Sequence, residues 1–156
     1  MFKQSILILL ACIGSLLLTS HASTPYDAVA KKYHIPPHVL KGILKVEGSG
    51  LTTKWNKGYP YHHAYGPGQM TCIAVKDLGY IKDCNRNNRY LNKDLTWVVK
   101  HLSGIKGVEM TCKYINLIKK RHKIKDWGTL VRSYNQGYGN RNNQNAYSYQ
   151  KKTGVK

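Results

Sequence analysis

Apolar residues recur along the chain at the spacing of amphipathic helices. In the segment 25–33 they stand at positions i, i+3, i+4 and i+7 of one helix face, as Tyr26, Val29, Ala30 and Tyr33. The same pattern returns further along, and prolines, glycines and an aspartate at a capping position mark its boundaries. The sequence therefore predicts six helices, at residues 25–33, 37–48, 69–79, 95–104, 108–120 and 126–137.

Strand-like alternation is absent, except that residues 50–65 have room for a short hairpin. From Asn140 onward the chain reads as a polar tail rich in Asn and Tyr, and it contains no internal repeat or linker. A length of 156 residues suits one domain with a real core. We therefore predict a single, mainly α domain, with an α+β arrangement containing a hairpin in residues 50–65 as the alternative.

The first 22 residues have the three parts of a secretory signal peptide: a charged Lys3, an apolar run over residues 6–18, and a small-residue site at residues 20–22. A retained membrane anchor is one alternative, but the run is shorter than the roughly 20 apolar residues of a spanning helix. Lipid attachment at Cys12 is another, but the apolar run continues past it. We expect cleavage, a mature domain of residues 23–156, and a location in the periplasm or cell envelope.

The chain carries 25 Lys and Arg against seven Asp and Glu, a formal charge of +18. Such a surface attracts polyanions whatever else the protein does. Because we expect export, an anionic wall polymer or a membrane surface is a better candidate partner than nucleic acid, which we do not expect to be bound. The charge does not indicate a reaction.

Three cysteines remain in the mature chain, Cys72, Cys84 and Cys112. An exported protein meets an oxidising compartment, and three thiols allow one disulfide. We favour Cys72 with Cys84 because they close a short loop, while pairing of either with Cys112 stays open. No pair has the CxxC spacing of a metal site, and the prolines between His34 and His38 keep those rings off one helix face. We expect no metal and no other cofactor.

Glu47 is the one acid between Asp27 and Asp77, and it ends the apolar stripe of the second predicted helix. Desolvation there, together with the negative end of the helix dipole, would raise the pKa of its carboxyl. A carboxylic acid that is protonated near neutral pH is the general acid of glycoside cleavage. The alternative is a solvated glutamate in a frayed last turn, paired with a nearby lysine.

Two further motifs are weak by themselves. Gly66-Pro67-Gly68-Gln69 is a turn that allows close backbone approach, after which Gln69 opens the third predicted helix. Tyr134-Asn135-Gln136-Gly137 places a phenol and two amides at the end of the last predicted helix. Each taken alone indicates only turn and capping chemistry.

In order and spacing, these motifs resemble those of the lytic transglycosylases of the Slt type, relatives of goose-type lysozyme. In that family a helix ends in a catalytic Glu followed by Ser, then come a Gly-Leu-Met-Gln motif and, near the C-terminus, a Tyr-Asn-Ala-Gly motif. Here they read Val46-Glu47-Gly48-Ser49, Gly66-Pro67-Gly68-Gln69 and Tyr134-Asn135-Gln136-Gly137. The resemblance covers most of residues 25–150 and implies a lysozyme-like fold.

The resemblance implies that Glu47 cleaves the bond between N-acetylmuramic acid and N-acetylglucosamine in peptidoglycan glycan strands. Glu47 would protonate the departing oxygen and then accept the proton of the C6 hydroxyl, which closes a 1,6-anhydro ring without a second carboxylate. It also implies substrate-binding residues: Ser49, Gln69, Tyr134, Asn135 and a late tyrosine, either Tyr149 or Tyr147.

The sequence departs from the family where Gly48 replaces the usual Ser, where Pro67 and Gly68 replace Leu and Met, and where Gln136 replaces Ala. Two other functions stay open: a hydrolytic lysozyme of the same fold, and a non-enzymatic exported protein that binds wall polymer or nucleic acid through its lysines. A secretion or conjugation apparatus is a further candidate partner, and we expect a monomer.

Overall fold

The computed structural model describes residues 23–48, 56–58, 62–84 and 95–156, so the predicted signal peptide and Ser49 lie outside it. Helices form most of this part of the chain, and a small antiparallel sheet accompanies them, which confirms the mainly α prediction and the hairpin. The helices are α1 (Pro25–Lys32), α2 (Pro37–Glu47), α3 (Cys72–Asp77), α5 (Leu95–Leu102), α6 (Gly104–Arg121), α7 (Trp127–Gln136) and α8 (Gln144–Thr153), with a 3₁₀ turn, η1, at Tyr138–Asn140. The strands are β1 (Asn56–Gly58), β2 (His62–Tyr65) and β3 (Met70–Thr71), in the order β1-β2-β3.

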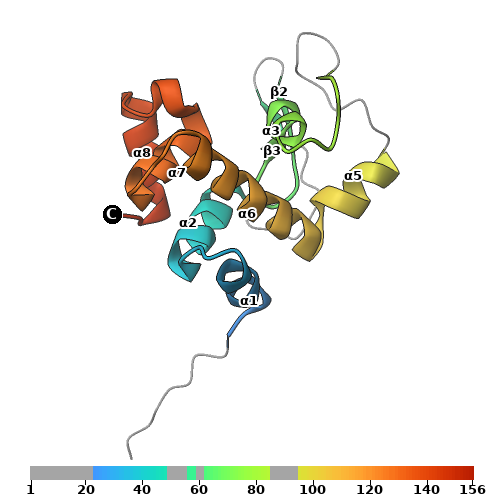
Figure 1. Ribbon diagram of the computed structural model, residues 1–156, viewed down its shortest axis with the longest axis horizontal. Coiled ribbons are helices and arrows are strands. Elements are labelled where there is room, and N and C mark those ends of the chain that lie inside the picture. The colour runs from blue at the N-terminus through green and yellow to red at the C-terminus, as the bar shows by residue number, and fades with distance from the viewer. Residues whose placement is uncertain (1–22, 49–55, 59–61, 85–94) are drawn as a thin grey trace, which may run out of the picture.

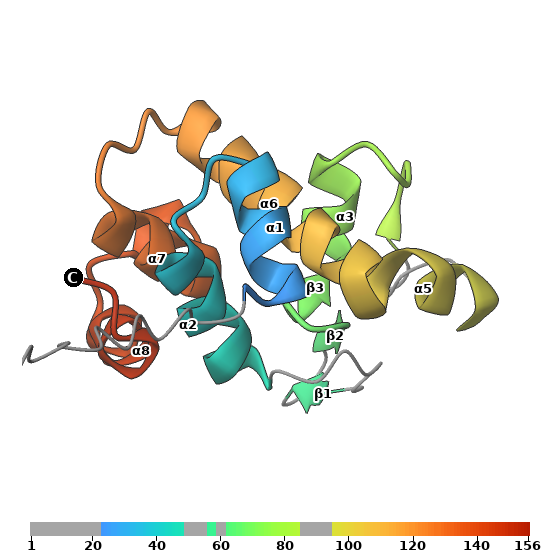
Figure 2. The same cartoon turned by 90° about the horizontal axis from the view of Figure 1, so that it is seen from below.

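Helix α6 runs through the middle of the molecule (Figures 1 and 2). Helices α1 and α2 lie on one side of it, α7 and α8 pack together near one end, and the sheet, α3 and α5 lie towards the other. Buried side chains form two clusters, a larger one between α1, α2, α6, α7 and α8, and a smaller one between the sheet, α3, α5 and α6. Tyr114 of α6 packs against both clusters, so α6 is the element that joins them.

Local sequence signals set several helix boundaries. Thr24 and Asp27 form a capping box at the start of α1, with the Thr24 N–H donating to Asp27 Oδ2 at 2.7 Å. Asp126 is the N-cap of α7 as predicted, because its Oδ1 accepts from the Thr129 N–H at 2.7 Å. Gly48 ends α2 with a φ of 110°, a conformation that glycine adopts without strain. Glu47 is therefore the last residue of α2.

The prediction that Gln69 opens the third helix is wrong. Met70 pairs with Tyr65 as part of β3, and the helix begins only at Cys72, where the Thr71 hydroxyl accepts from the Ala74 N–H at 3.3 Å. The apolar spacing that predicted this helix, Met70, Ile73, Ala74 and Leu78, also fails at Ile73, which is 46% exposed. Sheet pairing therefore overrides the helical spacing at this boundary.

Two other boundaries differ from the prediction. Gly104 begins α6, whereas the sequence pattern placed the start of that helix at Val108. Residues 144–153, predicted as part of a polar tail, form α8, capped by Asn143 through its Oδ1 and the Ala146 N–H at 2.8 Å. Only Ala146, Tyr149 and Thr153 of α8 are buried, so its apolar face is too thin for the hydrophobic pattern to detect.

The Cys72–Cys84 disulfide is present, with a Cα–Cα distance of 5.9 Å, and Cys112 is a buried free thiol. Cys72 is buried in the smaller cluster, and the partly buried Cys84 packs against it. Such bonds are typical of proteins that leave the cytoplasm. No helix among the described residues is long and apolar enough to cross a membrane.

Replacing both Cys72 and Cys84 with Ala should lower the free energy of unfolding by about 2–3 kcal/mol, because the unfolded chain regains the freedom of the closed loop. Urea unfolding of the oxidised wild type and of the variant measures the difference. Reduced wild-type protein is the control and should match the variant. Equal unfolding midpoints for the variant and the oxidised wild type would contradict a stabilising role for the bond.

Candidate active site

The end of α2 presents Glu47 beside two later helices. Its carboxyl is half-buried, and the Tyr149 hydroxyl of α8 donates to Glu47 Oε1 at 2.6 Å. The Asn135 side chain of α7 also hydrogen-bonds to this carboxyl. Asn135 is itself oriented by Gln136, whose amide nitrogen donates to Asn135 Oδ1 at 2.5 Å. Two side chains from α7 and α8 thus hold the carboxyl, and one of them, Tyr149, is 102 positions away from Glu47 in the chain.

Burial raises the pKa of Glu47 above its ordinary value, while the hydrogen bonds from Tyr149 and Asn135 act in the opposite direction. Burial is the largest of these effects, so the protonated form is favoured relative to a glutamate in water. The pKa of Tyr149 is also raised, first by burial and then by the charge of Glu47. Tyr149 therefore keeps its proton and remains a donor to Glu47.

Tyr134 links this carboxyl to the turn between β2 and β3. Its hydroxyl donates to the Gly68 carbonyl and lies 3.8 Å from the Met70 sulfur. Its ring packs against the larger cluster. Burial raises the pKa of Tyr134 well above its ordinary value, and the nearby charge of Glu47 is the next cause. Tyr134 therefore lies close to Glu47, but its hydroxyl donates its hydrogen bond to the turn.

The turn at residues 66–69 is stabilised by Gln69. Both the Gln69 N–H and its side-chain amide nitrogen donate to the Gly66 carbonyl, at 3.0 Å and 2.9 Å. Gln69 adopts a φ of 48°, which is uncommon for a residue other than glycine. These hydrogen bonds therefore give Gln69 a structural role within its own turn, and the adjacent Gly68 carbonyl accepts the hydrogen bond of Tyr134, which lies near Glu47.

The structure brings four predicted residues together: Glu47, Tyr134, Asn135 and Tyr149. Of the two candidate late tyrosines it places Tyr149 on the carboxyl, while Tyr147 is 50% exposed and packs under the Arg132 guanidinium. Ser49 is outside the described residues.

Thr111 was not predicted from the sequence. It is a buried residue of α6 whose hydroxyl lies against Tyr134 and donates to the Gly107 carbonyl at 2.9 Å. Its position three residues after Val108, on the apolar face of that predicted helix, was the available signal.

The other described acids form ion pairs or cap a helix. Asp27 pairs with Lys41 at 2.8 Å and Asp77 with Arg121 at 2.7 Å, and these were the nearest acids to Glu47 in the sequence. Asp83 and Glu109 pair with lysines, Asp126 caps α7, and Asp94 is outside the described residues. Across the described ranges, no three His, Cys, Asp or Glu side chains are grouped closely enough to hold a metal ion.

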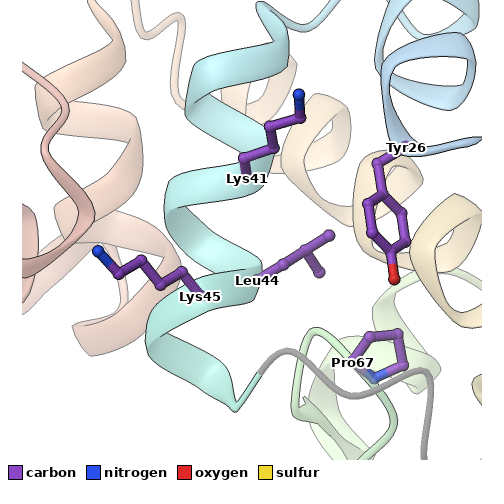
Figure 3. A pocket seen from close by; sticks show the side chains of 5 residues that line it. All are labelled: Tyr26, Lys41, Leu44, Lys45 and Pro67. Atoms are coloured by element: carbon purple, nitrogen blue, oxygen red, sulfur yellow. The ribbon is translucent and has the colours of Figure 1, made fainter. Parts of the chain in front are cut away.

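A small pocket of about 170 Å³ opens beside the last turns of α2, between α1 and the turn at residues 66–69 (Figure 3). Tyr26, Leu44 and Pro67 line it together with the stems of two lysines. The Lys41 amino group reaches away to Asp27, and that of Lys45 points away from the pocket. The result is apolar space one helical turn from Glu47.

Compared with known proteins, the chain is matched by no family model, no curated protein and no solved structure.

Proposed function

We propose that the protein is a peptidoglycan lytic transglycosylase, which cleaves the bond between N-acetylmuramic acid and N-acetylglucosamine and leaves 1,6-anhydro ends. The observation that carries the proposal is the Glu47 carboxyl, half-buried, with a raised pKa, and held by Tyr149 and Asn135. A carboxylic acid kept protonated in such a site is a suitable donor to a departing sugar oxygen. The motifs of the sequence suggest the substrate.

Within this proposal Glu47 acts twice. It protonates the oxygen of the scissile bond, and the resulting carboxylate then accepts the proton of the C6 hydroxyl as that oxygen bonds to C1. Tyr149 and Asn135 stabilise the carboxylate between these steps, because their hydrogen bonds favour the ionised form. Tyr134 orients the turn at residues 66–69 against the site through its bond to the Gly68 carbonyl.

The partners of the other described acids support this reaction over hydrolysis. Hydrolases that retain or invert use a pair of carboxyls, about 5–10 Å apart, on either side of the scissile bond. Here the other described acids form ion pairs or cap a helix. An intramolecular hydroxyl that attacks in place of water removes the need for that second group.

Product analysis tests the proposal. Purified peptidoglycan is digested with the protein, and the released fragments are weighed by mass spectrometry. We expect disaccharide units lighter by one water than lysozyme products, because the C6 hydroxyl closes the ring in place of solvent. Full-mass reducing sugars would assign a hydrolytic lysozyme to the same site. No release at all would leave a wall-binding protein without this activity.

Tyr149→Phe should shift the alkaline limb of the pH–rate profile to higher pH. The lost hydrogen bond favours the ionised carboxyl, so its removal raises the pKa of Glu47 further and keeps the acid protonated at higher pH. The maximal rate should fall roughly tenfold or more, since the carboxylate loses a charged hydrogen bond. Rates of wall digestion across a pH series give both quantities.

Tyr147→Phe is the matched control for this experiment, because it removes the same hydroxyl from a half-exposed ring of the same helix. It should leave the rate and the alkaline limb unchanged. If both variants behave like wild type, Tyr149 does not act on Glu47 during turnover.

A further inference from the structure

A second pocket, of about 410 Å³, lies away from Glu47 where the loop between α6 and α7 meets the segment 138–142. It shares no lining residue with the Glu47 site, and its rim is strongly basic. Lys123, Lys125 and Arg141 line it, against one acid, Asp126. These three cations and one carboxylate carry a net charge of two positive units.

The loop that carries the two lysines is fixed by the residue between them. Ile124 is buried in the larger cluster, and its N–H donates to the Lys119 carbonyl at 3.0 Å. Lys123 takes a φ of 51°, which turns the chain sharply after α6. Because Ile124 points into the core, Lys123 and Lys125 on either side of it are both exposed at the pocket.

Arg141 is also held in place. Its guanidinium lies 3.9 Å from the centre of the Tyr138 ring, and its Nη1 donates to the Tyr138 carbonyl at 2.6 Å. The Tyr138 ring stacks on His122 with the ring centres 4.1 Å apart and the planes 4° from parallel. The bond to the Tyr138 carbonyl uses one of the five N–H donors of a guanidinium, in a group whose orientation is set before a ligand arrives.

Asp126 does not neutralise this pocket fully. Its carboxylate accepts the Thr129 N–H at 2.7 Å, and this backbone hydrogen bond lowers the pKa of Asp126, so it stays ionised as the cap of α7. One negative charge among three cations still leaves an excess. A singly charged carboxylate ligand would balance only half of it, whereas a phosphate monoester carries about −1.5 to −2 at pH 7.

We propose that the pocket formed by Lys123, Lys125 and Arg141, beside the stacked His122 and Tyr138, binds a phosphate monoester group. Arg141 supplies a planar fork of donors for two phosphate oxygens, and the lysines add charge at the open side. The group has two possible sources, a soluble sugar phosphate or the headgroup of an anionic lipid. The proposal is independent of the reaction at Glu47.

Titration of the full chain at constant ionic strength, followed by NMR chemical shifts, tests it. Inorganic phosphate and glucose 1-phosphate should both shift resonances of residues 122–126 and 138–142 and saturate, while acetate at the same concentration should bind more weakly. Shifts spread evenly over the lysines of the molecule would overturn the proposal. So would acetate that binds as tightly as phosphate.

Charge variants distinguish a specific phosphate site from general electrostatic attraction of anions to the basic surface. Arg141→Gln and Lys125→Gln should each weaken phosphate binding about tenfold, the loss expected for one charge-assisted hydrogen bond. Lys106→Gln removes the same charge from an exposed position at the other end of α6 and should change the affinity less than about twofold. Equal losses in all three variants would show that net charge alone attracts the anion, against the proposal.

Asp126→Asn provides a test with the opposite sign. Asn caps helices as well as Asp does, so α7 is kept while the one negative charge of the pocket is removed. Phosphate binding should become several-fold tighter. An unchanged or weaker affinity, with an unchanged circular dichroism spectrum, would contradict the role assigned to these charges.

Binding of the same variants to lipid vesicles and to glucose 1-phosphate distinguishes the two possible sources of the phosphate group. Vesicles with phosphatidic acid carry a monoester headgroup, and vesicles with phosphatidylglycerol carry a diester. Binding to the first that exceeds binding to the second, and that Arg141→Gln weakens, identifies a lipid headgroup. Glucose 1-phosphate binding without vesicle binding identifies a soluble ester. If duplex DNA, a phosphodiester, shifts the pocket resonances and phosphate does not, the monoester proposal is wrong.

Discussion

Glu47→Gln should abolish turnover of peptidoglycan while leaving the fold intact. Gln keeps the shape of the side chain and can still accept a hydrogen bond from Tyr149, but it can neither donate the proton that the departing sugar oxygen needs nor take one from the C6 hydroxyl. Loss of positioned proton transfer costs about 100- to 10,000-fold in rate, and this residue would lose both of its tasks. Release of soluble fragments from purified walls measures the loss.

Glu109→Gln is the matched control for this variant. It makes the same chemical change in a glutamate that is ion-paired with Lys32 at 2.7 Å, on α6, away from the described contacts of Glu47. It should digest walls at the wild-type rate, and the two variants should sediment equally with insoluble walls. If Glu47→Gln clears walls as fast as wild type, Glu47 is only the last residue of a helix and the proposed function fails.

The apolar stripe of the second predicted helix was sufficient to predict that Glu47 ends this helix, partly buried and with a raised pKa, while its catalytic role stays a prediction that depends on the family resemblance. It could not choose between Tyr149 and Tyr147, since both lie in a segment with few apolar residues. The choice is made by tertiary packing. Gly42 of α2 lies so close to α8 that an added Cβ would be 2.4 Å from the Thr153 carbonyl oxygen. That close approach of the helices places Tyr149 on Glu47.

The turn at residues 66–69 was recognised for its glycines, but it was wrongly predicted to be the start of a helix, because it leads into β3. The substrate contact expected of Gln69 stays a prediction. In the structure the turn packs closely against α6: an added Cβ at Gly68 would lie 2.0 Å from the Thr111 hydroxyl, and one at Gly107 would lie 2.7 Å from the Pro67 ring. Contacts between residues so distant in the chain leave no local sequence pattern from which they could be predicted.

Gly66→Ala should therefore be among the most damaging single substitutions in the protein. Gly66 has a φ of 73°, and an added Cβ would lie 1.8 Å from the carbonyl oxygen of Leu102, a backbone atom that cannot rotate away. The left-handed conformation and the overpacking together should cost roughly 2–5 kcal/mol of stability. Because the Gly68 carbonyl moves with the turn, Tyr134 should lose its acceptor and wall digestion should fall. Urea unfolding and digestion rates measure the two effects.

Gly79→Ala separates the two causes. Gly79 has a φ of 79°, nearly the same conformation, but an added Cβ there would meet nothing within 4 Å. Its substitution should cost only the conformational part, about 1–2 kcal/mol, and should leave digestion of folded protein unchanged. The difference between the two variants then measures the contact of the turn with Leu102. If both variants lose the same stability and both remain active when folded, the turn relaxes without disturbing Tyr134, and the packing of the turn does not support the site.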